Sequence, residues 1–220
     1  MMPNNRKRRI LAIGAHGDDI ELACGGSLAK FIEEGHTVKV VVVTGTGLTD
    51  RNNISIRTPK IATEEINSAA EILGINDVEI LGYQDTEVQY SVNLIGDLDD
   101  IVASFNPDIV FTHFAFDTHQ DHISTSQSTI SACRNIKTVL LYEPINPSGQ
   151  GYIAFRPNLY IDISKYIDQK IKSLKAHNSQ LERYSEEWLR GVKSRAAFRG
   201  FELGTQYAEC FEVLRMKFDF

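Results

Sequence analysis

Long apolar runs are absent from this 220-residue sequence. No stretch approaches the roughly 18 apolar residues that a membrane-spanning helix needs, and the longest ones, such as VKVVVVT at 38–44, have the length of a strand. The apolar run behind the basic residues 6–9 ends at His16 and is too short for the core of a signal peptide. We therefore expect no stable membrane insertion and a cytoplasmic location.

Cysteine is scarce, with three residues in the whole chain at Cys24, Cys133 and Cys210. Their odd number and wide spacing provide neither a disulfide framework nor a zinc-type cysteine pair. We expect all three to be small core residues of a protein in a reducing compartment.

An excess of positive charge is also lacking. The chain has 23 Lys and Arg against 29 Asp and Glu, a formal net charge of −6, and four of the cations lie together at residues 6–9. Such a surface is not built to neutralise phosphates, which argues against nucleic acid as a partner. We expect residues 1–8 to form a flexible basic arm.

Neither glycine-rich phosphate-binding motif, GxGxxG or GxxxxGK[ST], occurs after the first predicted strand. That turn instead carries His16 and two acids, where a phosphate would need backbone amides and positive potential. Nucleotide binding at this turn is therefore disfavoured.

Short runs of β-branched residues alternate with helical patterns. The predicted strands are 9–14, 37–44, 77–81, 107–113, 138–143 and 159–163, and the predicted helices are 21–34, 59–73, 91–105 and 122–134. Several strand runs are continuous in Val, Ile and Leu, which is typical of strands covered on both faces. This order predicts an α/β fold with a mostly parallel sheet flanked by helices.

The last part of the chain indicates two helices, 164–184 and 186–204, and a final strand at 210–216. No internal repeat, low-complexity tract or linker marks a second domain. We expect a single domain over residues 1–220.

Two polar segments each follow a predicted strand, HGDD at 16–19 and HQDH at 119–122. The carboxyl ends of parallel strands meet at one edge of a sheet, so these segments can converge. Two histidines and one carboxylate with open positions form a catalytic zinc arrangement, in which a bound water has a pKa of roughly 7. A neighbouring acid could accept that proton, and a further histidine could stabilise an oxyanion. Spacing alone does not decide which acid has which role.

Each segment also has a plainer interpretation. A lone HxxH at a helix start is more often part of a polar surface than a metal site, and a lone pair of acids after a strand is usually a solvated helix cap. Their joint occurrence at one sheet edge favours the metal site. The three other histidines have no neighbouring acid or histidine motif, and we expect them to be structural: His36, His113 and His177.

The segments AHGDDIELACGGSLA and HQDH are similar to the two motifs of the PIG-L/LmbE family of zinc-dependent N-deacetylases, [AP]-H-P-D-D-x-E-x-x-x-G-G and H-x-D-H. Residues 64–75, 160–180 and 196–211 also follow later segments of that family. The resemblance implies a Rossmann-like sheet and hydrolysis of an N-acyl amino sugar, usually an N-acetylglucosamine unit, to an amine and acetate.

The resemblance also assigns roles to individual residues. His16, Asp19 and His122 match the metal ligands, and Asp18 matches the general base that takes a proton from a zinc-activated water. His119 matches the histidine that stabilises the tetrahedral intermediate, whereas Asp121 is expected to orient a histidine of the site. The implied cofactor is Zn²⁺, with Fe²⁺ or another divalent metal as alternatives.

The chain departs from the family pattern in two places. Gly17 occupies the position of a family proline, which we expect to loosen the loop by about 0.4–1 kcal/mol of lost pre-organisation. The family also often carries an arginine that touches substrate near Ala62, a place for which Arg57 and Lys60 are both candidates. Gly25 and Gly26 match the motif and would let the helix approach a neighbour closely or leave room for a sugar.

Two other functions stay open. Two histidines and one carboxylate also ligate Fe(II) in non-haem oxygenases, although the alternating α/β pattern is unlike the all-β pattern typical of such enzymes. A catalytically silent sugar-binding protein is the other alternative, against which the retained Asp18 argues. The expected partner is a small-molecule amino-sugar substrate, and a homo-oligomer stays open.

Overall fold

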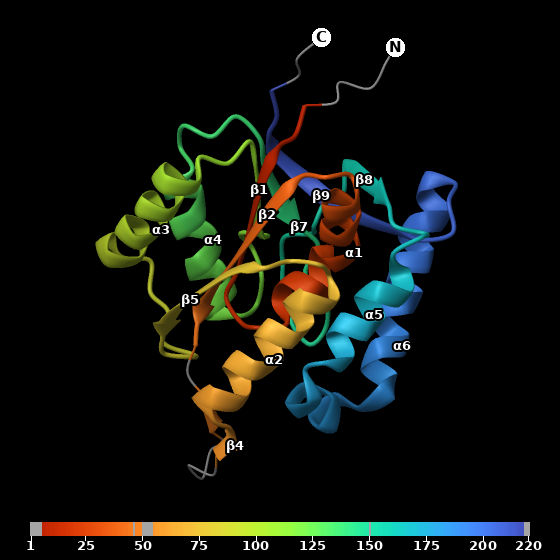
Figure 1. The fold of residues 1–220 in the computed structure, drawn as a ribbon, viewed down its shortest axis with the longest axis horizontal. Coiled ribbons are helices and arrows are strands. Elements are labelled where there is room, and N and C mark those ends of the chain that lie inside the picture. The colour runs from red at the N-terminus through yellow and green to blue at the C-terminus, as the bar shows by residue number, and fades with distance from the viewer. Residues whose placement is uncertain (1–5, 46, 50–54, 150, 218–220) are drawn as a thin grey trace.

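The computed structural model describes residues 6–45, 47–49, 55–149 and 151–217. Its main sheet has seven strands in the order β5-β2-β1-β6-β7-β9-β8 (Figure 1). The strands are β1 Arg9–Gly14, β2 Thr37–Thr44, β5 Asp77–Tyr83, β6 Ile109–His113, β7 Val139–Tyr142, β8 Leu159–Asp162 and β9 Ala208–Arg215. Strands β5, β2, β1, β6 and β7 are parallel, and β9 runs antiparallel to both of its neighbours. The predicted mostly parallel sheet is confirmed.

Two short strands form a separate antiparallel pair, β3 Leu48–Thr49 and β4 Ser55–Arg57. Neither β3 nor β4 was predicted, because strands of two or three residues are too short to show an alternating apolar pattern. Of the predicted arm at 1–8, residues 1–5 lie outside the described residues, and residues 6–8 are exposed before β1.

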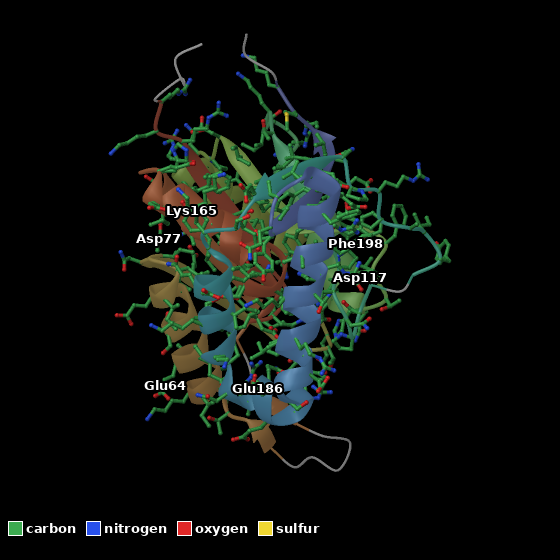
Figure 2. All side chains as sticks on the ribbon, turned by 90° about the vertical axis from the view of Figure 1, so that its right-hand side faces the viewer. Glu64, Asp77, Asp117, Lys165, Glu186 and Phe198 are labelled. Carbon is green, nitrogen blue, oxygen red and sulfur yellow. The ribbon has the colours of Figure 1, made fainter. Side chains whose placement is uncertain are left out.

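Helices cover both faces of the sheet (Figure 1). They are α1 Asp19–Glu33, α2 Pro59–Ile72, α3 Val92–Phe105, α4 Gln120–Ala132, α5 Ile167–Lys175 and α6 Asn178–Leu203. Helices α3 and α4 pack on one face, whereas α1, α2, α5 and α6 lie on the other side, where α5 stands between α2 and α6 (Figures 1 and 2).

Alternate residues of β1 and β2 supply the two halves of the core. Ile10 and Val40 pack toward α1 and α2, whereas Leu11 and Val41 pack toward α3 and α4, and all four are at most 2% exposed. Strands buried on both faces explain the continuous apolar runs. Within the described residues, no helix combines the length and apolar composition that crossing a bilayer requires.

The helix starts are set by local capping. Thr58 accepts a hydrogen bond from the Ile61 N–H (3.2 Å) ahead of Pro59, and Ser91 accepts one from the Leu94 N–H (3.3 Å). Helices α1 and α4 each begin two residues earlier than predicted. Both polar motifs therefore lie in the loop and first turn of a helix.

The predicted helix 164–184 is wrong as a single element. Helix α5 ends at Lys175 and α6 begins at Asn178, because the chain turns at His177, which is fully buried, and Ser179 binds Glu65 of α2. The predicted break at residue 185 is present as a non-helical Ser185, with φ 62° and ψ 179°. Tertiary contacts outweigh the local helical pattern here.

The cysteines are free and buried, as predicted. Cys24, Cys133 and Cys210 are each at most 1% exposed. Burial raises the pKa of the Cys133 thiol to about 12, so this group is unreactive at neutral pH.

A buried ion pair joins α1 to α5 and β9. Lys170 Nζ lies 2.5 Å from Glu209 Oε1 and also donates to the Leu22 carbonyl (2.7 Å). Glu209 accepts the backbone N–H groups of Gly26 (2.9 Å) and Ser27 (2.7 Å). Lys170 and Glu209 are 2% and 4% exposed, so the pair is tolerated because these hydrogen bonds satisfy both charges.

The two glycines of α1 differ in their surroundings. A Cβ at Gly26 would lie 2.8–3.0 Å from three atoms of Ile163, whereas a Cβ at Gly25 would lie 3.6 Å from Leu73, an ordinary contact. Neither residue lines the pocket described below. Gly26 therefore permits close packing of α1 and does not make room for a sugar.

We predict that Gly26→Ala lowers the free energy of unfolding by up to about 2 kcal/mol, because overpacking costs about 1–3 kcal/mol against a helix-propensity gain of about 1 kcal/mol. The matched variant Gly25→Ala should be neutral or more stable by up to about 1 kcal/mol. Urea unfolding of both variants measures the difference. Equal shifts in the two variants would contradict the packing argument.

Candidate metal centre

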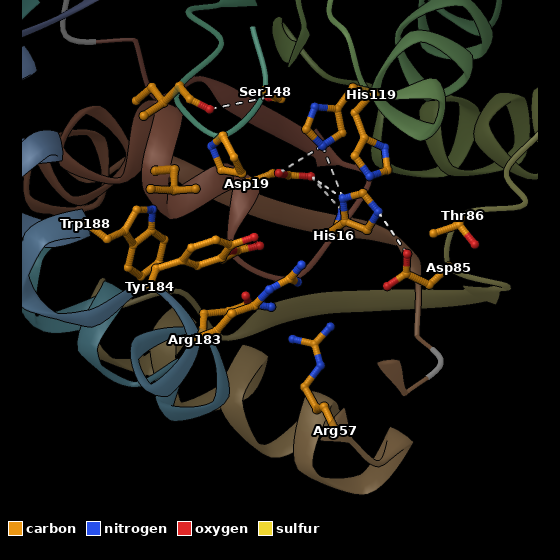
Figure 3. A pocket seen from close by; sticks show the side chains of 16 residues that line it. His16, Asp19, Arg57, Asp85, Thr86, His119, Ser148, Arg183, Tyr184 and Trp188 are labelled. Atoms are coloured by element: carbon orange, nitrogen blue, oxygen red, sulfur yellow. Dashed lines mark hydrogen bonds and ion pairs between the residues drawn. The ribbon is translucent and has the colours of Figure 1, made fainter. Parts of the chain in front are cut away.

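The two polar motifs meet at the carboxyl edge of the sheet. Strands β1 and β6 are neighbours, and the chain continues from β1 to β2 on one side but from β6 to β7 on the other. The loops that follow β1 and β6 therefore lie next to each other. Open α/β sheets bind ligands at such a switch point. A pocket of about 200 Å³ opens there (Figure 3).

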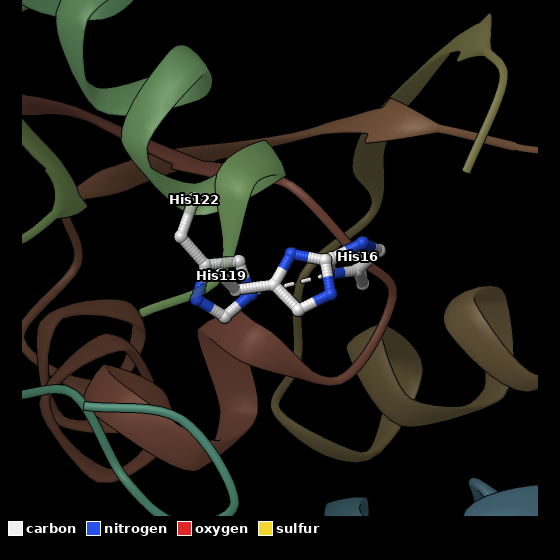
Figure 4. A group of neighbouring side chains, drawn as sticks. All are labelled: His16, His119 and His122. Carbon is white, nitrogen blue, oxygen red and sulfur yellow. Dashed lines mark hydrogen bonds between the residues drawn. The ribbon is translucent and has the colours of Figure 1, made fainter. Parts of the chain in front are cut away.

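Three side chains converge on one point at the base of this pocket. His16 Nδ1 lies 3.1 Å from His122 Nε2 and 3.4 Å from Asp19 Oδ2, and His122 Nε2 lies 3.3 Å from Asp19 Oδ1. Figure 4 shows the two rings facing each other beside His119. The structure thus brings together the three residues that the sequence predicts as metal ligands.

Buried carboxylates orient both rings. His16 Nε2 lies 3.0 Å from Asp121 Oδ2, and His122 Nδ1 lies 2.8 Å from Asp117 Oδ2. When each ring donates its N–H to its carboxylate, the lone pairs of the other two nitrogens face Asp19 and each other. Three acceptors at such distances repel unless a cation or a proton lies between them, so the donor set fits a divalent metal.

Charges dominate the protonation of this cluster in the metal-free protein. Burial lowers the pKa of His122, but the Asp19 charge and the hydrogen bond to Asp117 outweigh it and raise that pKa to about 9. Burial raises the pKa of Asp19, but the charges and hydrogen bonds of His122 and His113 outweigh this effect and hold that pKa well below its usual value. Without a bound cation, the Asp19 carboxylate is therefore ionised and the His122 ring is protonated.

Asp121 is fully buried and accepts hydrogen bonds besides the one from His16. The N–H groups of Thr86 (2.7 Å) and Val88 (3.2 Å) donate to it. Burial raises the pKa of Asp121, but the His16 and Thr86 hydrogen bonds lower it below its usual value. Asp121 thus contacts His16 in the way expected of an orienting carboxylate, and Asp85 Oδ1 lies 3.4 Å from the same ring nitrogen.

His119 lines the pocket at the first turn of α4. Its Nδ1 accepts the Asp121 N–H (3.2 Å), and its ring centroid lies 4.7 Å from those of His16 and His122. Burial and the two neighbouring histidines lower its pKa. A neutral ring that accepts at Nδ1 carries its proton on Nε2, where it can donate a hydrogen bond to a ligand.

Asp18 occupies the cap position of α1 but makes no side-chain cap hydrogen bond. Its carboxylate lines the pocket, next to the cluster formed by its neighbour Asp19. The interpretation of the two acids as an ordinary solvated cap therefore does not describe Asp18.

His113, which the sequence predicts to be structural, lies directly against the cluster. Its Nε2 accepts the Ala15 N–H (2.9 Å) and lies 3.2 Å from Asp19 Oδ2, and its ring stacks on His122 at 4.1 Å. Burial lowers its pKa to about 4, so the ring is neutral. Since the Ala15 N–H occupies the Nε2 lone pair, His113 is not arranged as a ligand, and its ring packs against that of His122.

Asp117 was not predicted as a site residue, although it lies only two residues before His119 in the acid-rich stretch DTHQDH.

The other two histidines that were expected to be structural lie away from the cluster. His36 Nδ1 accepts the Arg8 N–H (3.3 Å), and His177 is buried 3.7 Å from Glu21.

Helix α6 supplies an unexpected wall of the pocket. Arg183, Tyr184 and Trp188 line it, and Arg57 reaches it from the end of β4 (Figure 3). Lys60, the other candidate for a substrate-facing cation, is 85% exposed and pairs with Glu64. The sequence carried no local signal for the α6 wall, because its residues become neighbours of the motifs only through the fold.

The loop residue Gly17 is closely covered. A Cβ there would lie 2.6 Å from Cγ1 of Ile66 on α2. The Ile66 side chain thus fills the space that a larger residue would need, so the loop is supported by packing where the family has a proline ring.

Comparison with known proteins gives related sequences and folds. The sequence model of the PIG-L family, described as GlcNAc-PI de-N-acetylase, matches residues 11–133, which include both motifs. The uncharacterized deacetylase YaiS of Escherichia coli (strain K12) is 37% identical over 182 residues, which cover 80% of this chain and 93% of YaiS.

Two further relatives have named activities. Diacetylchitobiose deacetylase of Thermococcus kodakarensis is 25% identical over 222 residues, covering 94% of this chain and 83% of that enzyme. The structure of N,N'-diacetylchitobiose deacetylase from Pyrococcus horikoshii superposes with a TM-score of 0.82 at 25% identity, covering 96% and 85% of the two chains. The family match over both motifs and the identity to YaiS together show that this chain belongs to the PIG-L family of deacetylases.

Proposed function

We propose that this protein is a metal-dependent hydrolase that removes the N-acetyl group from an amino-sugar-containing small molecule or glycoconjugate. The observation that carries the proposal is the convergence of His16, Asp19 and His122 in an open pocket. Asp18, which makes no side-chain cap hydrogen bond, lines the same pocket. The related deacetylases named for diacetylchitobiose support an amino-sugar substrate.

His16 Nδ1, His122 Nε2 and the Asp19 carboxylate would hold the metal, for which we propose Zn²⁺. Nitrogen and oxygen donors suit zinc, and three protein ligands leave a position open for water or substrate. When bound, the ion would act as a Lewis acid toward the acyl carbonyl and lower the pKa of water toward about 7.

The remaining side chains divide the proton chemistry. Asp18 accepts a proton from the attacking water and later delivers it to the leaving amine, a role that suits a carboxylate without a competing cap hydrogen bond. The His119 Nε2–H donates a hydrogen bond to the oxyanion of the tetrahedral intermediate, because its Nδ1 is held by the Asp121 N–H. Asp121 positions His16 through the contact at Nε2.

The direct test is acetate release from a panel of N-acetyl amino sugars by the metal-reconstituted protein. We expect release that a chelator abolishes and that Zn²⁺ restores. Oxygen consumption with a 2-oxo acid would instead support an iron oxygenase. Sugar binding without any metal-dependent acetate release would support a silent binding protein.

We predict that Asp18→Asn keeps the bound metal and lowers turnover by about 10²–10⁴-fold, because an amide cannot accept the proton. The adjacent variant Asp19→Asn is the matched control and should lose the metal. Metal content by elemental analysis and acetate release measure both effects. Normal deacetylation by Asp18→Asn would refute the assignment of the base.

We predict that His122→Ala loses both metal and turnover, whereas Asp117→Asn weakens metal affinity by about 10–100-fold, because it removes only the carboxylate that orients the ring. Asp97→Asn is the matched control, because Asp97 lies on α3 and its carboxylate accepts an exposed hydrogen bond from the Tyr83 hydroxyl. Competition titration with a zinc-binding dye gives the affinities. Unchanged affinity in Asp117→Asn would contradict the orienting role.

A further inference from the structure

Residues 145–149, which follow β7 and which we call the β7–β8 wall, are attached to the candidate metal centre. Ile145, Pro147 and Ser148 of this wall line the pocket (Figure 3). The Ser148 hydroxyl donates a hydrogen bond to Asp117 Oδ2 (3.2 Å), the oxygen that His122 Nδ1 also contacts at 2.8 Å. One carboxylate oxygen therefore joins the β7–β8 wall to a candidate metal ligand.

The other oxygen of Asp117 is held by backbone groups. Oδ1 accepts the N–H groups of Thr118 (2.5 Å), His119 (3.2 Å) and Gly149 (2.9 Å). The first two belong to the turn before α4, whereas Gly149 belongs to the β7–β8 wall. Asp117 is only 6% exposed, so protein donors on two segments set the orientation of its carboxylate.

The local geometry favours both wall contacts with Asp117. Ser148 Oγ also lies 3.4 Å from the Ile145 carbonyl, but a hydroxyl has one hydrogen, and the shorter distance and the negative charge favour Asp117. Gly149 has φ 88°, and a Cβ there would lie 2.7 Å from Cβ of Pro144. The turn that directs the Gly149 N–H toward Asp117 therefore requires glycine.

We propose that Ser148 is a positioning residue of the metal centre, which acts on His122 through Asp117. The inference rests on the metal site of the proposed function and adds a residue that would not touch the metal. Without the hydroxyl, Oδ2 of Asp117 loses its donor from the wall, and the carboxylate turns away from the direction in which it holds the His122 ring. Nε2 of His122 then presents its lone pair to the metal less accurately.

The first experiment measures zinc affinity in the full-length protein by competition with a zinc-binding dye. We expect Ser148→Ala to weaken zinc binding by about 3–10-fold, less than Asp117→Asn, because it removes one donor to the carboxylate and leaves the carboxylate in place. Ser104→Ala is the matched control and should bind zinc normally, since Ser104 lies on α3 and its hydroxyl donates to the Ile101 carbonyl (3.1 Å) of the same helix. Unchanged affinity in Ser148→Ala would overturn the proposal.

A double-mutant cycle tests the route through Asp117. If Ser148 acts by way of that carboxylate, Ser148→Ala should change zinc affinity by less than about 2-fold in the Asp117→Asn background. A double variant whose loss equals the product of the two single losses would show that Ser148 acts independently of Asp117, which refutes the proposal.

A spectroscopic measurement separates positioning from a general loss of stability. Co²⁺ in place of zinc absorbs visible light, and its bands depend on the coordination geometry. At saturating Co²⁺ we expect the bands of Ser148→Ala to differ from those of the unmodified protein, because the His122 ring is turned, and the bands of Ser104→Ala to match them. An unchanged spectrum in Ser148→Ala would refute the positioning role even if its affinity falls.

None of these measurements uses a substrate, so the inference and the proposed function fail separately. Absence of acetate release from every substrate refutes deacetylation, yet weaker zinc binding and altered Co²⁺ bands in Ser148→Ala still support the positioning role. If acetate release is present and Ser148→Ala changes only KM, with normal zinc affinity and Co²⁺ bands, Ser148 contacts substrate and the positioning role is refuted.

Discussion

The approach of His16 Nδ1 to His122 Nε2, 3.1 Å apart beside Asp19, is the constraint on which the rest of the site depends. Nitrogen lone pairs do not face each other at this distance without a cation or proton between them. The buried Asp117 and Asp121 enforce the arrangement by taking the opposite N–H of each ring. A metal bound here would displace a proton, so its affinity would fall in acid.

The fold supplies this constraint through strand order. Neighbouring β1 and β6 end at one edge, and the candidate site residues lie in the loop and helix start that follow each strand. The Lys170–Glu209 pair fixes α1 to α5 and β9 behind the site, with hydrogen bonds to consecutive backbone amides of α1. Helix α1, which begins at Asp19, is therefore fixed by Lys170 and Glu209, neither of which lines the pocket.

Sequence patterns predicted most of this architecture because apolar runs mark β1 and β2 and because both motifs follow strands. They failed where a residue acts through distant partners. His113 looked isolated although it ends β6 beside Asp19, which lies 94 positions earlier at the start of α1. The break at His177 depends on burial beside Glu21. The α6 wall has no motif, since lining a pocket imposes no periodicity on a helix.

The α6 wall lies outside residues 11–133, the part of the chain that the family model matches and that contains every candidate metal ligand. The residues of the two motifs and those of the α6 wall thus come from separate stretches of the chain. A helix that carries Arg183, Tyr184 and Trp188 can change its side chains without moving His16, Asp19 or His122. Grafting the corresponding helix of a relative onto this chain would therefore exchange one wall of the pocket and leave both motifs in place.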